Sequence, residues 1–399
     1  MTGHEAVVGE NAVQERASRV PRQSRISDIL APGRLAKGLP VSESFKHLEI
    51  STMGKTTIPI ALKIVLFSAV LSMFPAGAVA QPDWAVVNTF HLGGDGSWDY
   101  VTVDSKTHRL YVPRTTHTMV VDTESGKVVA DIPGQKRAHG VALVPEAGRG
   151  FISDGGGDGA IEIFDLKTNA VLGTIAALPD ADGIIYDKSS DRVLVVSGDK
   201  GVLMTLKPDV DPKNGKIEDP IELGGAPEFL AADGTGKAYI NLEDKNLVAV
   251  VDLKDRKVLS RWPVAPGGAP VGMSMDTKKR HLFIGCRNPQ KLIVMSADDG
   301  KILADLPISA GVDATKFDGS QAFASCRDGK FYVAGETSAG KFEIVETVQT
   351  PEGARTMDAD RSAHKIYLPT AEFEAAKPGA RPATKPGTFM IVVVGKQSK

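Results

Sequence analysis

Short apolar runs recur along the chain at a nearly constant spacing, and most of them end on an aspartate. The runs are WDYVTVD, DGIIYD, PEFLAAD, PVGMSMD, VDATKFD and RTMDAD, and they end at Asp104, Asp187, Asp233, Asp276, Asp318 and Asp360. HGVALVP fits the same frame with Pro145 in place of the aspartate. Neighbouring endpoints are 41 to 46 residues apart. A period of this length is typical of a protein built from repeated supersecondary units.

Each endpoint is followed by a few turn residues and a second apolar run, and most units continue with a third and a fourth run. The first unit shows this as RLYV, TMVVD and KVVADI, with the turn ESGK between the last two. β-Branched and aromatic residues dominate these runs, as expected for strands. Four strands per unit, repeated seven times, predict an all-β fold: a seven-bladed β-propeller with four-stranded blades. A β-sandwich is the alternative, and seven units in register argue against it.

The two ends of the repeat region are predicted to share one blade. The last unit has TFMIVVV (388–394) as its third strand and then ends. WAVVNTFHL (84–92) would supply the missing fourth strand, so that the N-terminal strand closes the ring. This pairing removes the exposed edges that an open sheet would have. The Pro- and Ala-rich insert at 372–387 predicts a long surface loop in this last blade.

The first 80 residues differ from the rest. Residues 1–52 are polar, mix both signs of charge and lack apolar periodicity, which indicates disorder or an over-called extension with Met53 as the true start. Residues 53–80 have lysines at positions 55 and 63, an apolar stretch at 64–73 and an Ala-Val-Ala site, the pattern of a secretory signal peptide. The apolar run is short for a transmembrane anchor. We therefore expect an exported, periplasmic or secreted protein comprising residues 81–399.

The composition and charge of the chain indicate which kinds of partner to expect. The chain has 399 residues, 42% of them hydrophobic, and a formal net charge of −2. Length alone would suggest two or three domains, but one long all-β domain fits equally well. A nearly neutral chain gives no reason to expect nucleic acid as a partner. We expect a monomer with no membrane span after the leader is removed, whose partner is a small molecule or another protein.

Candidate functional residues come from projecting the repeats onto a propeller. The first strand of each blade lines the central channel, and its start lies on the same face as the loop after the second strand. Counting back five residues from each endpoint gives Asp99, Gly140, Asp182, Glu228, Val271, Asp313 and Arg355, with His139 beside the glycine. The loops after the second strands add Asp154, Asn241, Glu243, Arg287 and Arg327, with further polar residues at 158, 199, 244, 288 and 328. Together they predict an acidic, Arg-flanked channel mouth.

Two interpretations of this mouth stay open. Polar residues often close a propeller channel, and aspartates at strand ends cap turns, so the ring could be purely structural. Converging carboxylates nevertheless repel one another unless a cation, an arginine or a proton compensates. A divalent cation is therefore the candidate cofactor, with His139, Asp182, Glu228 and Asp313 as ligands. Oxygen ligands suit calcium, whereas His139 with carboxylates suits a transition metal.

The same groups allow an enzymatic alternative. His139 or a carboxyl group of raised pKa could act as a general base, and Arg287, Arg327 and Arg355 could hold an anionic substrate. A metal-dependent hydrolase or lyase would need such parts. The sequence has no GxSxG or HExxH motif, and SDGGGDG lacks the lysine of a phosphate-binding loop.

Three further residues have two interpretations each. Cys286 and Cys326 lie at equivalent positions in adjacent repeats, and in an exported protein they could form a disulfide. They could instead be free thiols that face the channel, because the two Cα atoms must approach to within about 7 Å for a bridge. Trp98 could be a stacking wall for a ligand or a packing residue.

The repeats resemble the YVTN type, in which the second strand reads RLYV and a D-x-x-x-G-K turn follows the third. Here the pattern is RLYVPRTTHTMVVDTESGKVV. The chain resembles the YncE-like, YVTN-repeat family of bacterial β-propellers over residues 84–396. This resemblance implies the fold and export, and it implies little about activity, although related propellers include lactonases and a lyase. We expect a binding propeller that uses Trp98, Asp99 and the mouth residues for a small ligand, a metal or a protein partner.

Overall fold

The computed structural model describes residues 83–375 and 382–397. The predictions for residues 1–52 and 53–80 fall outside this part of the chain. All regular elements of the described residues are β-strands, apart from two short 3-10 turns at Pro145–Ala147 and Glu243–Lys245. No helix among them is long and apolar enough to cross a bilayer.

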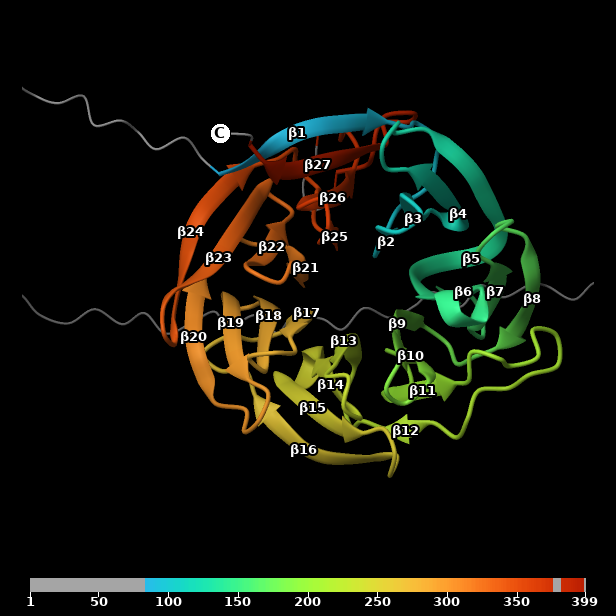
Figure 1. Cartoon of the computed structure of the whole chain (residues 1–399), viewed down its shortest axis with the longest axis horizontal. Helices are drawn as coiled ribbons and strands as arrows, with labels where there is room; N and C mark the ends of the chain where they lie inside the picture. The colour runs from blue at the N-terminus through green and yellow to red at the C-terminus, as the bar shows by residue number, and fades with distance from the viewer. Residues whose placement is uncertain (1–82, 376–381, 398–399) are drawn as a thin grey trace, which may run out of the picture. The chain divides into compact units, whose positions relative to one another are not determined.

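The strands form seven four-stranded antiparallel blades arranged around a central axis (Figure 1). Blades 1 and 2 contain β2 (Thr102–Asp104), β3 (Arg109–Pro113), β4 (Thr115–Asp122), β5 (Val128–Val144), β6 (Arg149–Asp154), β7 (Ala160–Asp165) and β8 (Val171–Ala176). Blade 3 contains β9 (Ala181–Asp187), β10 (Arg192–Ser197), β11 (Val202–Leu206) and β12 (Ile221–Glu222). Blade 4 contains β13 (Pro227–Ala232), β14 (Lys237–Leu242), β15 (Leu247–Asp252) and β16 (Lys257–Pro263).

The remaining three blades complete the ring. Blade 5 contains β17 (Pro270–Asp276), β18 (His281–Arg287), β19 (Gln290–Ser296) and β20 (Ile302–Pro307). Blade 6 contains β21 (Val312–Phe317), β22 (Ala322–Cys326), β23 (Lys330–Ser338) and β24 (Lys341–Gln349). Blade 7 contains β25 (Asp358–Asp360), β26 (Lys365–Thr370), β27 (Met390–Lys396) and β1 (Trp84–His91).

Blades 1 and 2 share one continuous strand. The start of β5 pairs with β4, from Val128 opposite Val121 to Pro133 opposite His117. The end of β5 pairs with β6, from Ala138 opposite Asp154 to Val144 opposite Arg149. The same strand is therefore the outer strand of blade 1 and the inner strand of blade 2.

The predicted closure of the ring is confirmed. β1 pairs antiparallel with β27, with Trp84 opposite Lys396 and His91 opposite Met390. Chain ends that are far apart in sequence therefore share one sheet, at the top of Figure 1. Around the axis, each inner strand contacts the inner strand of the next blade, in the order β2, β5, β9, β13, β17, β21, β25 and back to β2.

The hydrophobic core is divided among the blade interfaces. Seven buried clusters each combine side chains from two neighbouring blades, so every interface has a core of its own. Middle strands such as β15 are buried on both faces, whereas the outer strand β16 alternates between half-buried and exposed residues. A blade is thus a sheet with two buried faces and one solvent-facing edge, which explains the near-continuous apolar runs of the repeats.

Candidate functional site

The mouth residues lie at β-bulges in the inner strands. In blades 2 to 6 the pairing of the inner strand with the second strand shifts at the same place, where one extra residue is accommodated. The residues at these bulges are His139, Asp182, Glu228, Val271 and Asp313. A bulge interrupts the ladder and re-aims a side chain, and here the polar side chains of His139, Asp182, Glu228 and Asp313 reach the mouth of the channel, whereas Val271 packs in the core between blades 5 and 6.

In blade 2 the structure corrects which residue was predicted to lie at the mouth. Counting from Pro145 placed Gly140 at the mouth, but β5 ends its pairing at Val144, opposite Arg149. Pro145 begins a 3-10 turn instead. The residue five positions before Val144 is His139, so the histidine and not the glycine occupies the mouth position.

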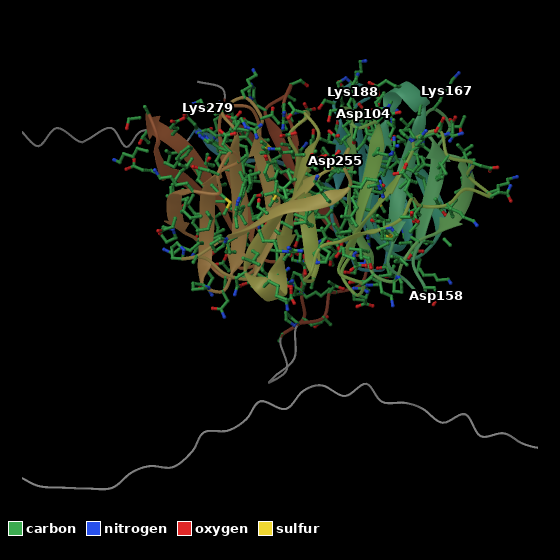
Figure 2. The ribbon with its side chains drawn as sticks, turned by 90° about the horizontal axis from the view of Figure 1, so that it is seen from below. Asp104, Asp158, Lys167, Lys188, Asp255 and Lys279 are labelled. Atoms are coloured by element: carbon green, nitrogen blue, oxygen red, sulfur yellow. The ribbon has the colours of Figure 1, made fainter. Side chains whose placement is uncertain are left out.

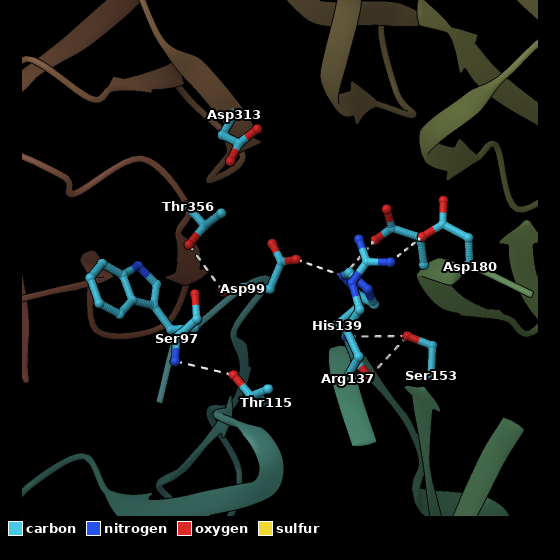
Figure 3. A network of polar contacts seen from close by, with 12 residues as sticks. Ser97, Asp99, Thr115, Arg137, His139, Ser153, Asp180, Asp313 and Thr356 are labelled. Carbon is cyan, nitrogen blue, oxygen red and sulfur yellow. Dashed lines mark hydrogen bonds and ion pairs between the residues drawn. The ribbon is translucent and has the colours of Figure 1, made fainter. Parts of the chain in front are cut away.

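Asp99, His139 and Asp182 form one cluster from three consecutive blades, and Figure 3 shows Asp99 and His139 facing each other. His139 Nδ1 lies 2.7 Å from Asp99 Oδ2 and 3.4 Å from Asp182 Oδ1. One ligand atom from each residue lies within 4.8 Å of the others. Asp182 Oδ1 is buried without a hydrogen-bond partner among the described residues. Two carboxylates and an imidazole that converge in this way are a donor set suited to a divalent metal.

The protonation of this cluster follows from burial and mutual charge. Burial lowers the pKa of His139, but the hydrogen bond to Asp99 and the charges of Asp182 and Asp99 outweigh it, so the pKa is raised overall. Burial raises the pKa of Asp182, and the charge of His139 opposes that increase. The carboxylates thus outweigh burial at His139, whereas burial outweighs the imidazole charge at Asp182.

Two glutamates of blade 4 continue the ring. Burial raises the pKa of Glu228 well above its usual range, and a hydrogen bond with Glu243 and the charge of Asp182 add to the effect. Glu243 in turn accepts a hydrogen bond from Arg287 Nη1 at 3.0 Å. These contacts connect the two ends of the first strand pair in blade 4, as predicted from their antiparallel arrangement.

On the far side of the mouth, arginines neutralise the acidic residue of blade 6. Asp313 is buried and forms ion pairs with both Arg287 and Arg355. Arg355 Nη2 also donates to the carbonyl of Trp98, and Thr356 Oγ1 donates to the carbonyl of Asp99 at 3.0 Å. Blade 5 has the apolar Val271 at its bulge and contributes Arg287 from the end of β18 instead. All seven blades therefore supply a polar side chain to one ring, which we call the mouth ring: Asp99, His139, Asp182, Glu228, Glu243, Arg287, Asp313 and Arg355.

An aromatic layer lies directly below the mouth ring. Tyr100 and Phe229 follow Asp99 and Glu228 in sequence, and their ring centroids are 4.5 Å apart. The equivalent positions in blades 2, 3 and 5 are Gly140, Gly183 and Gly272, where an added Cβ atom would lie within 3.0 Å of a neighbour. Gly183 lies against Phe229, and Gly140 and Gly272 lie against the inner strands of the next blades, so these glycines allow the inner strands to approach closely around the channel. Burial, followed by the charges of Asp182, Glu228 and Asp99, raises the pKa of Tyr100 well above its usual value.

A cavity of about 260 Å³ lies next to this layer, between the inner strands. Its wall is mostly aliphatic, and it includes Tyr100, Phe229, Lys316 and Asp358. Lys316 Nζ lies 3.0 Å from Asp358 and 5.6 Å from the centroid of the Phe229 ring. The aromatic layer thus lies between a charged mouth and this largely apolar cavity.

Several residues predicted for the mouth have structural contacts instead. Asp154 accepts hydrogen bonds from the backbone N–H groups of Lys136, Arg137 and Gly156. Asn241 Nδ2 donates to the carbonyls of Val271 and Gly272 in the next blade. These polar residues therefore fix loops and blade contacts, as their positions at strand ends allow.

Trp98 and Arg327 lie beside the mouth ring. Trp98 is buried against Phe389 and Phe373, at ring centroid distances of 5.5 and 6.3 Å, so it packs rather than forming an open wall. Arg327 lines a cavity of about 340 Å³ between blades 6 and 7, together with Phe373 and Pro382 from the predicted long loop.

The two cysteines do not form the disulfide that the sequence allowed. Both are free and fully buried. Cys286 belongs to the core between blades 4 and 5, whereas Cys326 belongs to the core between blades 5 and 6. Burial raises the pKa of each thiol to about 12. The alternative of thiols facing the channel is also wrong, because each side chain packs in an interblade core.

Two features were missed by reasoning from the sequence. Arg114 is fully buried, stacks on Phe389 at 3.6 Å and donates to the carbonyls of residues 93 to 97, which shapes the loop that leads to Trp98 and Asp99. Nothing in the local pattern distinguishes this arginine from an exposed one. Tyr100 and Phe229 had a signal, namely aromatic residues at a repeat position where the other blades have small residues.

No protein family model matches the sequence, and no curated protein matches it. Solved structures with a similar fold include Kuenenia stuttgartiensis hydrazine synthase, with 12% sequence identity and a TM-score of 0.59 over 70% of this chain and 94% of that chain. The WD40 repeats of RRP9 align with 10% identity and a TM-score of 0.64 over 78% of this chain and 99% of that chain. At these identities the likeness shows the β-propeller fold alone.

Proposed function

We propose that this protein is a binding propeller whose mouth ring holds a divalent transition metal at Asp99, His139 and Asp182. The observation that carries the proposal is the convergence of one imidazole nitrogen and two carboxylates from three adjacent blades. Imidazole as a donor favours zinc or iron over calcium, and the two carboxylates also suit manganese. Three protein ligands leave coordination positions for a small ligand that enters from the mouth.

The sequence-based ligand set changes accordingly. His139 and Asp182 stay in the proposed site, and Asp99 joins them. Asp313 is excluded because Arg287 and Arg355 already neutralise it. Glu228 shares its contact with Glu243 and lies beside the cluster as a carboxyl group of raised pKa. A neutral Glu228 adds no negative charge to the site, which limits repulsion within the ring.

The metal content of the purified protein tests this proposal. We expect about one equivalent of zinc or manganese per chain after loading and dialysis, and loss of that metal in the double variant Asp99→Asn, Asp182→Asn. The matched control is Asp199→Asn, which changes an exposed aspartate on the same face of blade 3. A double variant that retains the metal, or a wild-type protein that binds none, would refute the site.

A metal-dependent hydrolase or lyase at the same mouth is the second candidate. Glu228 favours this candidate function. Its raised pKa would keep a proton on its carboxyl group at neutral pH, beside the proposed metal ligands, and a general acid needs such a proton. A panel of lactones and esters, assayed with the same double variant, separates the two functions. Turnover that depends on the cluster would support the enzyme, whereas metal binding without turnover would support the binding propeller.

We further propose that the protein is exported and belongs with YncE-like, YVTN-repeat propellers. The support is the leader-like pattern of residues 53–80 together with the start of β1 at Trp84, shortly after the Ala-Val-Ala site. Expression in a Gram-negative host should give a periplasmic protein whose mass corresponds to a start at Gln81. A cytoplasmic protein that retains residues 53–80 would contradict export.

A further inference from the structure

A further pocket lies between blades 3 and 4, at the face opposite the mouth. Its volume is about 470 Å³, and Arg192, Glu218, Thr235, Gly236, Lys254 and Arg256 contribute to its wall. Thr235 and Gly236 follow the first strand of blade 4, so they lie at the other end of the strands from the mouth. Figure 2 shows the two faces, with Lys167 and Lys188 at one edge of the ring and Asp158 at the other.

Two arginines in this pocket share one carboxylate. Arg192 Nε lies 2.8 Å from Glu218 Oε1, and Arg256 Nη1 lies 2.8 Å from Glu218 Oε2. Although burial opposes it, hydrogen bonds from Thr205 and Arg192 lower the pKa of Glu218, which therefore stays charged. One negative charge between two guanidinium groups leaves a net positive charge.

Lys254 adds a further positive charge to the wall. It is exposed, and the ion pairs among the described residues do not include its ammonium group. The lining thus has three cationic side chains and one acidic side chain, although the whole chain has a formal net charge of −2. A local excess of positive charge in a concave site attracts anions.

The guanidinium groups are held in place by the fold. Arg256 donates to Thr205 Oγ1 at 2.8 Å and to the carbonyl of Asp219. Arg192 donates to the carbonyls of Ser190 and Asp191 at 3.3 and 2.9 Å. A guanidinium group has more N–H donors than these contacts use, so each arginine has capacity to bind a ligand without rearranging.

A purely structural role explains only part of this arrangement. Glu218 lies in the segment that connects β11 and β12, and one arginine would be enough to fasten this segment to the ring. Both arginines also bond protein groups, which fixes their positions, whereas the Lys254 ammonium group has no ion pair among the described residues and faces the open volume of the pocket. Fixed guanidinium groups match the oxygens of a phosphate or sulfate group, and the volume exceeds what a bare inorganic ion needs.

We propose that the pocket formed by Arg192, Lys254 and Arg256 binds a small organic phosphate or sulfate ester. This site is independent of the mouth ring, because it lies on the other face and shares none of its residues. The anionic group would lie against the arginines and the ammonium group. The organic part would extend over Thr235 and Gly236, at the open side of blade 4.

Calorimetric titration of the purified protein at constant ionic strength tests the proposal. The probes are glucose 6-phosphate, glucose 6-sulfate and inorganic phosphate, with sodium chloride as the reference salt. We expect saturable binding of at least one ester, tighter than binding of inorganic phosphate. Equal affinity for the inorganic ion would overturn the assignment to an ester, and no saturable binding at millimolar concentration would overturn the site.

The main variant changes an exposed side chain, so that a loss of binding can be separated from a loss of folding. Lys254→Gln changes an exposed residue and should weaken binding by about tenfold, as expected for loss of one charge-assisted hydrogen bond. Arg192→Gln should weaken binding at least as much. Lys167→Gln is the matched control, because Lys167 occupies the same turn of blade 2, after Asp165, that Lys254 occupies after Asp252. Equal affinity in Lys254→Gln and Lys167→Gln would overturn the proposal.

Discussion

Glu162 lies on β7 at the interface between blades 1 and 2, and its side chain is almost completely buried. Its partner is Gln135, whose Nε2 donates to the Glu162 carboxyl group, and Thr118 Oγ1 in turn donates to Gln135 Oε1. Burial raises the pKa of Glu162 to about 7, with a further increase from the charge of Asp154. Asp313 is neutralised by two arginines, whereas no ion pair among the described residues includes Glu162.

This raised pKa predicts a stability that falls with increasing pH. A folded-state pKa of about 7, above the ordinary value of 4.5, means that the folded protein holds a proton that the unfolded chain has released. The contribution of protonated Glu162 to the unfolding free energy is fully present below pH 4.5 and is lost as the pH rises through 7. We expect Glu162→Gln to remove this loss, so that the variant exceeds the wild type at pH 8 by about 1–3 kcal/mol in unfolding free energy.

Urea unfolding at pH 5 and pH 8 measures the difference. Glu222→Gln serves as the control, because it changes an exposed glutamate on the short strand β12 and should follow the wild-type pH dependence. If Glu162→Gln and Glu222→Gln show the same change between the two pH values, burial of Glu162 does not set its pKa.

At the scale of strands, the β-bulges in the inner strands bring the polar residues of different blades to the mouth of the channel. Without them, strict alternation would direct the residues at this position into the interblade cores, like their neighbours Val101 and Leu230. With one extra residue in each of the inner strands of blades 2 to 6, the polar side chains of four of these blades reach the mouth, and only Val271 of blade 5 stays in a core. The acid and base groups therefore meet although neighbouring members of the cluster are 40 and 43 residues apart in sequence.

The closing strand β1 predicts a large effect from one residue. Trp84 is 1% exposed, contacts Phe323 edge-to-face at 4.9 Å and donates through Nε1 to Gln321 Oε1 at 2.9 Å. Its backbone N–H donates to Glu346 Oε1 of blade 6 at 3.1 Å. We expect Trp84→Ala to lower the unfolding free energy by about 3–5 kcal/mol, because it removes packing and a hydrogen bond at the seam of the ring.

Val87→Ala is the matched control on the same strand, since Val87 is 45% exposed. Its expected effect is below about 0.5 kcal/mol. Equilibrium unfolding in urea compares the two variants. A similar, small loss for both would show that β1 contributes little to closure of the ring.

The whole ring presents two chemically different faces. One carries the mouth ring, with its acids, arginines and histidine, and the other carries the cationic pocket between blades 3 and 4. The aromatic layer of Tyr100 and Phe229 lies between the mouth ring and the cavity among the inner strands. A metal or ligand bound at one face would therefore not compete sterically with an anion at the other.

The sequence by itself determined the architecture. Its apolar runs, their period and the unpaired run at each end were enough to predict seven blades and the closure by β1, because strand patterning is a local property of the chain and an incomplete last unit leaves one edge for the first run to pair with. It also placed seven of the eight mouth-ring residues directly, and His139 within one residue. The prediction for blade 2 was off by one residue because Pro145 was counted as the last residue of the strand, whereas the strand ends at Val144 and Pro145 begins a turn.

Only the tertiary structure decided which polar residues meet. It assigned Asp154 and Asn241 to loops and blade contacts, separated Cys286 from Cys326 into different cores, and joined Asp99 to His139 and Asp182. It also revealed the pocket of Arg192 and Arg256, residues that share no motif. Charge, burial and distance between blades are long-range quantities, and a repeat pattern fixes where each residue lies in its blade but not what faces it across the channel.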